Sequence, residues 1–244
     1  MYDDLSDARA CLDWTISNLP TFEEHLLGWL KNNVEVVVVD LPNGGPNDVI
    51  VAREKEPVPI FFNIEAGAYI NTIRSSLDIL AYTIGARDKV IFPNTIYFPV
   101  AESAADFASG KYKGADFVKQ LSGTARKLIE SVRPYQGGNE ALWALHRFDI
   151  LRKHRRLLAA EVHPQKLHVH GFGLSQTFTP TALVPAGNGE TVLGLLAKGA
   201  KKPAIEYTAM VIFNEPTVMK RCGVSSALNY FASAAREIIG LFDC

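Results

Sequence analysis

The chain has 244 residues, of which 48% are hydrophobic and 21% charged, with 26 acidic and 25 basic side chains. This length and composition predict one large globular domain around an apolar core. The near-neutral charge balance argues against a protein that coats nucleic acid or anionic lipid, because such binding needs a broad basic field. No apolar run is long enough to cross a bilayer, and the first residues are acidic where a signal peptide is basic. We therefore expect a cytoplasmic protein with no membrane partner.

The first 60 residues carry the patterns of two helical segments and a hairpin. Asp3–Asn18 has helical apolar spacing, and Thr21–Glu24, just after Pro20, resembles a capping box that opens a second helical segment. The β-branched run Val34–Asp40 is followed by the turn-rich PNGGPND and a second run, Val49–Arg53. These two runs predict a β-hairpin with a longer loop.

The middle of the chain reads as mainly helical. Ile64–Ile84 is a long helical pattern that we expect to stop at Gly85. After the aromatic and proline-rich VIFPNTIYFPV, shorter helical patterns cover Ala104–Phe107 and Gly123–Val132. A second long helix is predicted over Glu140–Ala160.

The last third changes to strand periodicity. After Pro164 the segments HVHGFGLS, ETVLGLLAKG and IEYTAMVIF alternate with period two and predict three antiparallel strands, and Ser225–Phe242 predicts a closing helix. We expect a single α+β domain, 1–244, in which a helical, bundle-like core packs with an antiparallel β-sheet. The helical core would comprise about 60–160 plus 223–243, and the sheet would combine about 34–54 with 165–214.

Two cationic residues stand out when Glu140–Ala160 is projected as a helix. Arg147 and His154 fall on the apolar face, beside Trp143, Leu157 and Leu158. A buried guanidinium needs a carboxylate, a carbonyl cluster or a bound anion. Two interpretations stay open: a structural ion pair with a hydrogen-bonded core histidine, or an Arg/His site for an anionic ligand. The opposite sector, which we expect to face solvent, contains His146, Asp149, Arg152, Lys153 and Arg156.

The helix predicted over Ile64–Ile84 has a sparsely charged polar face, which is either solvated or part of a site. Arg74 and Asp78 are spaced to pair locally, and Asp78 is the best carboxylate to meet Arg147 or His154. We therefore predict that the two long helices face each other. The polar face comprises Asn71, Ser75, Asp78 and Tyr82, flanked by Arg74.

A histidine pair marks the late strands. His168 and His170 alternate along a strand and project from one side, and His163 lies a few residues earlier. Such a pair with a third ligand can hold zinc, copper or iron. A plain polar sheet face and an anion site are the alternatives. The GxSxG, Walker A and HExxH motifs are absent, and we expect no cofactor.

One stretch of the chain resembles a group of uncharacterised bacterial proteins. Their shared pattern is Gly-x-x-x-His-Asn-Leu-Arg-Ser-Ala-Leu-Asp-His-Leu-Ala, then an aromatic-Pro segment and Asp-Lys-His-Arg. The matching stretches here are Gly67–Ala81, Tyr97–Val100 and Arg152–Arg155. Asn71 and Ile79 stand where the pattern has histidines, and an arginine replaces its aspartate. Retained are Arg74, Asp78, Lys153, His154 and Arg155.

The segment Arg147–His154 is also similar to HEPN domains, helical bundles of which many are metal-independent ribonucleases. Their signature is an Arg, four to six residues and a His on one helix, and RFDILRKH has this spacing. Phe148 stands where a polar residue usually follows the arginine. The resemblance implies a phosphate or RNA site and a homodimer that brings two such sites together.

Three functions remain open from the sequence. The first is a protein that binds a phosphate-containing ligand or RNA, with ribonuclease activity as its catalytic version. The second is a non-catalytic binding or scaffold protein with a buried Arg/His/Asp network, and the third is a metal-dependent enzyme at His168 and His170. For the first, the candidate catalytic residues are Arg147, His154 and Asp78. The candidate ligand-binding residues are Asn71, Arg74, Tyr82, Lys153 and Arg155.

Overall fold

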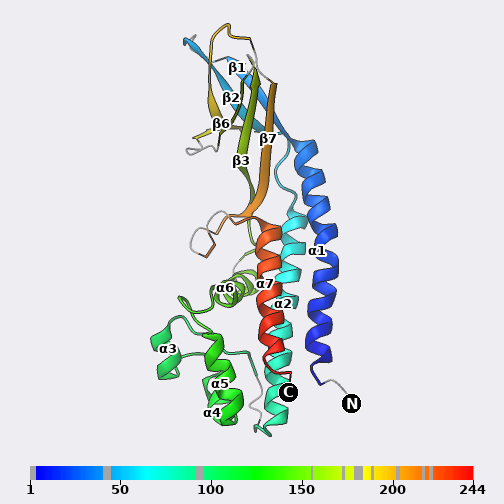
Figure 1. The fold of residues 1–244 in the computed structure, drawn as a ribbon, viewed down its shortest axis with the longest axis vertical. Coiled ribbons are helices and arrows are strands. Elements are labelled where there is room, and N and C mark those ends of the chain that lie inside the picture. The colour runs from blue at the N-terminus through cyan, green and yellow to red at the C-terminus, as the bar shows by residue number, and fades with distance from the viewer. Residues whose placement is uncertain are drawn as a thin grey trace.

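The computed structural model is an elongated α+β protein with helices at one end and strands at the other (Figure 1). It describes residues 4–40, 45–91, 96–154, 156–171, 174–178, 184–187, 190–201, 204–215, 218–219 and 222–243. The predicted combination of a helical core with antiparallel strands is confirmed. Among the described residues, none of the helices combines the length and hydropathy that a bilayer crossing requires.

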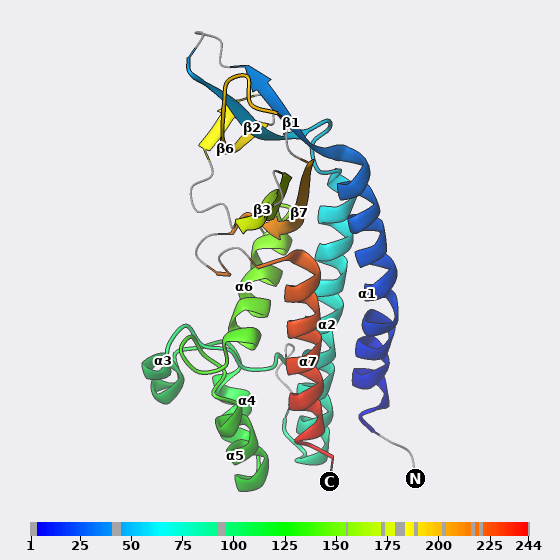
Figure 2. The ribbon, with the colours of Figure 1, turned by 45° about the horizontal axis from the view of Figure 1, so that its top comes forward.

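Three long helices lie side by side and form most of the core: α1 (Ser6–Asn33), α2 (Ile60–Arg87) and α7 (Val224–Gly240) (Figures 1 and 2). Each turns a row of buried apolar side chains toward the other two. A fourth helix, α6 (Glu140–His154), packs against α2 and α7. Its Phe148 ring lies 5.9 Å from that of Phe231 on α7. The prediction that the two long helices α2 and α6 face each other is confirmed.

Several helix boundaries differ from the sequence expectations, including the start of α2 at Ile60 and not Ile64. α1 continues through Pro20, because the burial of Leu19 and Phe22 on either side stabilises the helix despite the lost backbone hydrogen bond. α2 likewise continues through Gly85, which is buried. α6 ends at His154, six residues earlier than expected, because Ala160 already pairs with Phe213 in a β-ladder.

Short helices connect α2 to α6 and lie beside the start of α6 (Figure 2). They are α3 (Ala104–Ser109), α4 (Ala115–Gln120) and α5 (Gly123–Val132). Ser103 caps α3 and Ser122 caps α5, each accepting a backbone N–H from the first turn. α4 was not predicted from the sequence.

The strands form two antiparallel sheets where one was expected. The predicted hairpin of β1 (Val34–Asp40) and β2 (Asn47–Glu54) is confirmed. β2 then pairs with β6 (Glu190–Ala197), which pairs with β5 (Val184–Gly187), giving the order β1-β2-β6-β5. The second sheet has the order β4-β3-β7, with bounds Leu174–Phe178, Ala160–Gly171 and Ala204–Phe213.

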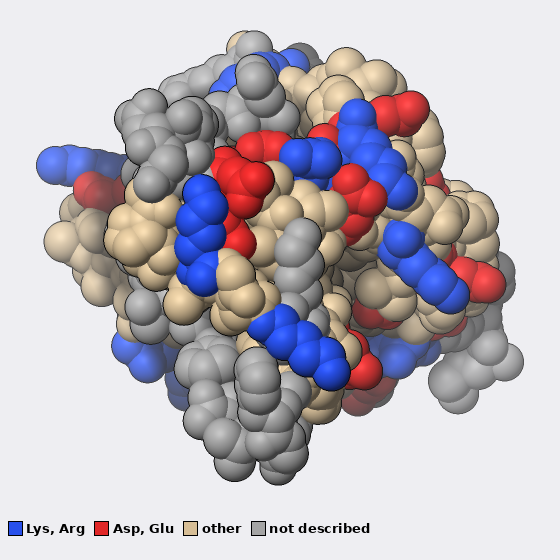
Figure 3. Space-filling view, turned by 90° about the horizontal axis from the view of Figure 1, so that it is seen from above, with Lys and Arg blue, Asp and Glu red and all other residues tan. Residues whose placement is uncertain are grey.

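The strands form two sheets and not one because the end of β7 packs into the helical core. Val211 and Phe213 at its end are buried in the helical core, and the Phe213 ring lies 4.9 Å from that of Phe148. β3 follows α6 directly and pairs with β7. Seen from the strand end, Lys and Arg side chains are interspersed with Asp and Glu, so the part of this face that the structure describes has no broad basic field (Figure 3).

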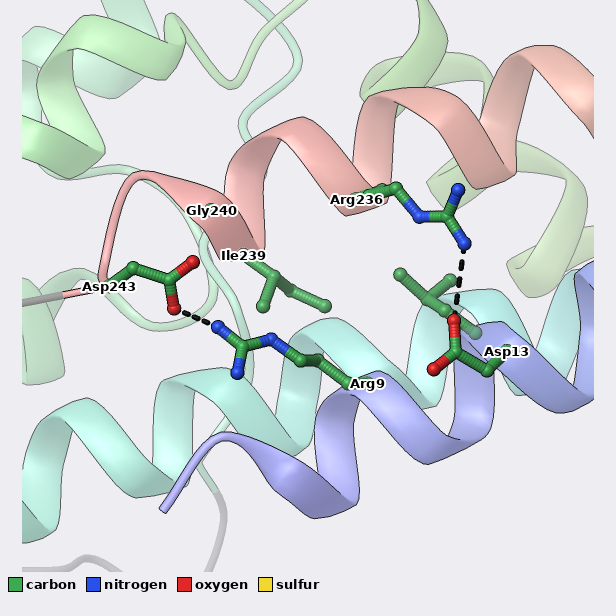
Figure 4. A pocket seen from close by; sticks show the side chains of 7 residues that line it. Arg9, Asp13, Arg236, Ile239, Gly240 and Asp243 are labelled. Atoms are coloured by element: carbon green, nitrogen blue, oxygen red, sulfur yellow. Dashed lines mark hydrogen bonds and ion pairs between the residues drawn. The ribbon is translucent and has the colours of Figure 1, made fainter. Parts of the chain in front are cut away.

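Ion pairs join α1 to α7 around a small cavity of about 230 Å³ (Figure 4). Arg9 pairs with Asp243, and Arg236 pairs with Asp13 at 3.1 Å. All four side chains are substantially exposed to solvent. Exposed pairs of this kind contribute at most about 1 kcal/mol each, so the apolar contacts of α1 and α7 hold this end of the molecule together.

Candidate functional site

A cavity of about 560 Å³ lies between α2, the 96–113 segment and α6. We call it the α2–α6 cavity. It gathers charged and aromatic side chains from segments far apart in the sequence. The residues that line it are Arg74, Asp78, Tyr97, Phe98, Val100, Ala101, Glu102, Lys111, Tyr112, Lys113, His146, Asp149, Ile150, Lys153 and His154.

The inner wall of the cavity is built on Arg74, whose side chain is only 3% exposed. Its Nη1 donates to Asp78 Oδ1 at 2.7 Å, and its Nη2 donates to the Phe98 carbonyl at 2.8 Å. The Phe98 N–H donates to the same Asp78 oxygen at 2.8 Å. The predicted Arg74–Asp78 pair is thus present, and it also fixes the 96–98 segment to α2.

Burial raises the pKa of Asp78, while Arg74, the Phe98 N–H and Lys153 all oppose that rise. The sequence suggested that Asp78 meets Arg147 or His154. In the structure it accepts hydrogen bonds from Arg74 and from the Phe98 N–H instead. Arg74 lies one helix turn from Asp78 on α2, whereas Arg147 and His154 belong to α6. The local pair forms because its two side chains are already neighbours on one helix.

A second buried carboxylate, Asp149, comes from α6. Its Oδ2 lies 2.7 Å from Lys153 Nζ, its Oδ1 accepts from Asn71 Nδ2 at 3.4 Å, and Arg152 lies 3.9 Å away. The expectation that this sector of α6 faces solvent is wrong for Asp149, His146 and Arg152, which are buried or half-buried, whereas Lys153 and Arg156 are exposed as expected. The close approach of α6 to α2 needs Gly67, where a Cβ would lie 2.6 Å from Arg152 Cδ.

Arg147 and His154 do not point into an apolar core, contrary to the helical projection. Arg147 Nη1 pairs with Glu102 Oε1 at 2.8 Å, and about a third of its side chain is exposed. His154 is exposed in the last turn of α6 and lines the cavity. The projection assumed a helix through Ala160, but Leu157 and Leu158, two of the residues assigned to the apolar face, lie beyond the end of α6.

The other predicted ligand-binding residues divide between the cavity and its surroundings. Lys153 lines the cavity, and Asn71 supports it through Asp149. Tyr82 is 59% exposed and is not among the lining residues. Arg155 lies outside the described residues.

His146 is a cavity residue that the sequence assigned to solvent. Burial lowers its pKa to about 4, and the cations of Arg74, Arg147, Lys113 and Lys153 add to this effect. The imidazole is therefore neutral at pH 7. Its spacing from Asp149 and Lys153, three and seven residues, was the available signal that these polar residues share one side of the helix.

The 97–113 segment supplies cations that sequence patterns did not reveal. Lys113 Nζ lies 3.7 Å from the centre of the Tyr97 ring, and Lys111 is exposed at the same opening. No carboxylate within the described part of the chain pairs with either lysine. The turn after Lys113 needs a glycine, because Gly114 has a φ of +98° and a Cβ there would lie 3.1 Å from the Tyr97 carbonyl.

No protein-family model, curated protein or solved structure matches this chain. The HEPN-like similarity of α6 stays a prediction. The chemistry of the α2–α6 cavity accordingly rests on the residues that line it.

The three histidines of the predicted metal site lie together on β3, but few other potential metal ligands lie near them. His163, His168 and His170 are opposite Met210, Glu206 and Ala204 of β7, so a bulge near residue 165 places all three on one face. His168 Nδ1 lies 2.9 Å from Thr177 Oγ1, and His170 Nε2 lies 3.8 Å from Glu206. Within the described ranges, no group of three or more His, Cys, Asp or Glu residues could hold a metal ion.

Proposed function

We propose that the α2–α6 cavity binds a phosphate-bearing anion. The observation that carries this proposal is that the carboxylates of the cavity are paired with cations, whereas two lysines at its opening have no carboxylate partner among the described residues. Each carboxylate that lines the cavity already has a cationic partner: Asp78 has Arg74, Asp149 has Lys153, and Glu102 has Arg147. Lys111 and Lys113 at the opening have no such partner among the described residues, so they are available to an anion.

The size and lining of the cavity support a small organic ligand rather than a bare ion. Its volume of about 560 Å³ falls within the range of small-molecule pockets. Tyr97 and Tyr112 offer aromatic surface beside the lysines, and the Tyr112 ring is held by stacking on Phe107 with centres 5.0 Å apart. A phosphate group at the lysines would leave the rest of a ligand against these rings.

Lys113→Glu is expected to weaken the binding of inorganic phosphate and pyrophosphate by at least about tenfold, because it replaces an attractive charge with a repulsive one. Isothermal titration calorimetry at low ionic strength measures the change. Lys127→Glu is the matched control, since Lys127 is exposed on α5 and does not line the cavity. Equal affinities in the two variants, or no phosphate binding by the wild-type protein, would contradict the proposed site.

Cleavage of a phosphodiester bond is a second candidate, favoured by two histidines of one helix that line the same cavity. His146 is neutral inside, and His154 is exposed at the rim. In RNA, one histidine would take the proton of the 2′-hydroxyl as its oxygen attacks phosphorus. The other would protonate the departing 5′-oxygen, and the nearby lysines would stabilise the added negative charge. Arg147 would have to exchange Glu102 for phosphate to take part.

His154→Ala is expected to lower RNA cleavage by about 10²-fold or more while leaving the thermal midpoint unchanged, because His154 is exposed and buries nothing. Gel assays on a pool of short RNAs, with a chelator present, measure the rate. His25→Ala on the exposed side of α1 controls for the loss of a surface histidine. Intact RNA after long incubation with the wild-type protein rejects the ribonuclease and leaves anion binding to be judged by calorimetry.

A further inference from the structure

His146 has an unusual position among the cavity residues. The residue is partly buried on α6, and its ring lines the cavity close to several cations. Within the part of the chain that the structure describes, no side chain or backbone group forms a hydrogen bond or ion pair with this ring. Among the described residues its nitrogens therefore have no hydrogen-bond partner, and cavity solvent or a ligand can take that place.

Charged groups approach this ring from all the elements around the cavity. α2 contributes Arg74 and Asp78, and α6 itself contributes Arg147, Asp149 and Lys153. The connecting segment contributes Lys113, with Glu102, Lys111, Tyr97 and Tyr112 further along the wall. The three carboxylates are paired with Arg74, Arg147 and Lys153, so Lys113 is the cation of this group that no carboxylate of the described residues balances.

We propose that His146 takes up a proton from solvent when an anion enters the cavity and then donates a hydrogen bond to that anion. This inference rests on the proposed function, because it concerns the same site. Burial is the main reason that the imidazole is neutral, and the nearby cations add to it. An anion at Lys113 offsets this positive field, and it supplies the acceptor that the protonated ring lacks. Anion binding and protonation of His146 thereby favour each other.

The sign of the coupling follows from proton linkage. The bound form holds more protons than the free form between the low pKa of His146, about 4, and the ordinary histidine value near 6.5. Affinity therefore rises as the pH falls through this window, by up to about tenfold per pH unit. Asp78 has a raised pKa, and its protonation would also favour an anion, so variants at both residues are needed to separate them.

Sulfate is the appropriate probe, because its charge stays constant from pH 4.5 to 8. Calorimetric titration at pH 5.5, in two buffers of different ionisation enthalpy, counts the protons taken up on binding. We expect roughly 0.9 proton for the wild-type protein and for Asp78→Asn, and close to none for His146→Gln. His25→Gln, at an exposed position of α1 that does not line the cavity, is the matched control and keeps the uptake.

The possible outcomes separate the two proposals. If neither sulfate nor phosphate binds at any pH, the proposed function fails, and this inference fails with it. If sulfate binds without proton uptake, or if His146→Gln takes up as many protons as wild type, anion binding stands and the role of His146 is overturned. A second readout needs no variant: the NMR signal of His146 Cε1 should titrate near pH 4 without sulfate and near pH 6.5 with it.

Discussion

Arg74→Ala is expected to lower the free energy of unfolding by about 3–5 kcal/mol. The guanidinium is 3% exposed and donates to both Asp78 and the Phe98 carbonyl. Its removal leaves a mostly buried carboxylate without its cation and a buried carbonyl without its donor. Because Phe98 belongs to the wall of the cavity, the 96–102 segment should also loosen from α2.

Urea denaturation followed by circular dichroism measures this loss. Arg236→Ala is the matched control, since the same substitution there removes only an exposed pair with Asp13 and should cost at most about 1 kcal/mol. Arg74→Lys tests the geometry, because a lysine keeps the charge but cannot reach two acceptors with a fixed fork. If Arg74→Ala unfolds at the same urea concentration as Arg236→Ala, the network around Asp78 does not stabilise the fold.

Acidification from pH 6.5 to 4 is expected to destabilise the protein through His146. Its pKa of about 4 in the folded chain lies below the unfolded value near 6.5, so the unfolded chain binds more protons in this window. Stability therefore rises with pH across the window and is lost as the pH falls. The contribution is roughly 2–3 kcal/mol at the acid end.

The measurement compares urea midpoints at pH 7 and pH 4.5, in buffers free of phosphate and sulfate. His146→Gln should flatten the pH dependence, whereas His25→Gln on exposed α1 should leave it unchanged. The raised pKa of Asp78 acts in the opposite direction, because the folded chain then binds the extra proton. Asp78 contributes equally to the stability of the wild-type protein and of His146→Gln, so subtracting one stability from the other removes its effect. If this difference in stability does not change with pH, the effect of His146 is contradicted.

A non-catalytic scaffold role predicts the same loss for Arg74→Ala but no response to anions. If the α2–α6 cavity binds phosphate, saturating phosphate should raise the stability of wild type by mass action. The rise should be smaller in Lys113→Glu than in Lys127→Glu. Phosphate-independent stability in all three proteins would favour the scaffold.

The sequence correctly predicted those features that depend only on residues close together in the chain. The limits of α5 match the helical pattern of Gly123–Val132, and the β1–β2 hairpin follows from two β-branched runs around a turn-rich loop. The Arg74–Asp78 pair follows from i, i+4 spacing alone. These features depend on residues within a few positions of each other, so no knowledge of the rest of the fold was needed.

Long-range packing overrode other local signals. Pro20 should break a helix, but buried neighbours on both sides keep α1 continuous. The late strands divide into two sheets because β7 is anchored in the helical core, which period-two alternation does not encode. Lys111 and Lys113 carry no motif, and they reach the cavity only because the turn at Gly114 brings the chain back to Tyr97.

The sequence by itself determined that α2 and α6 carry the polar residues of interest. It also predicted that these helices meet, although the contact of Asp78 with α6 on which that prediction rested is not among its hydrogen bonds. Only the tertiary structure decided which side of α6 faces the cavity. That side depends on how α6 packs against α2 and α7, and the projection had also extended α6 into residues that pair as β3 with β7. Asp149 and His146 thus lie inside and Arg147 at the edge, because the burial of a helix face is decided by its packing partners and not by its own periodicity.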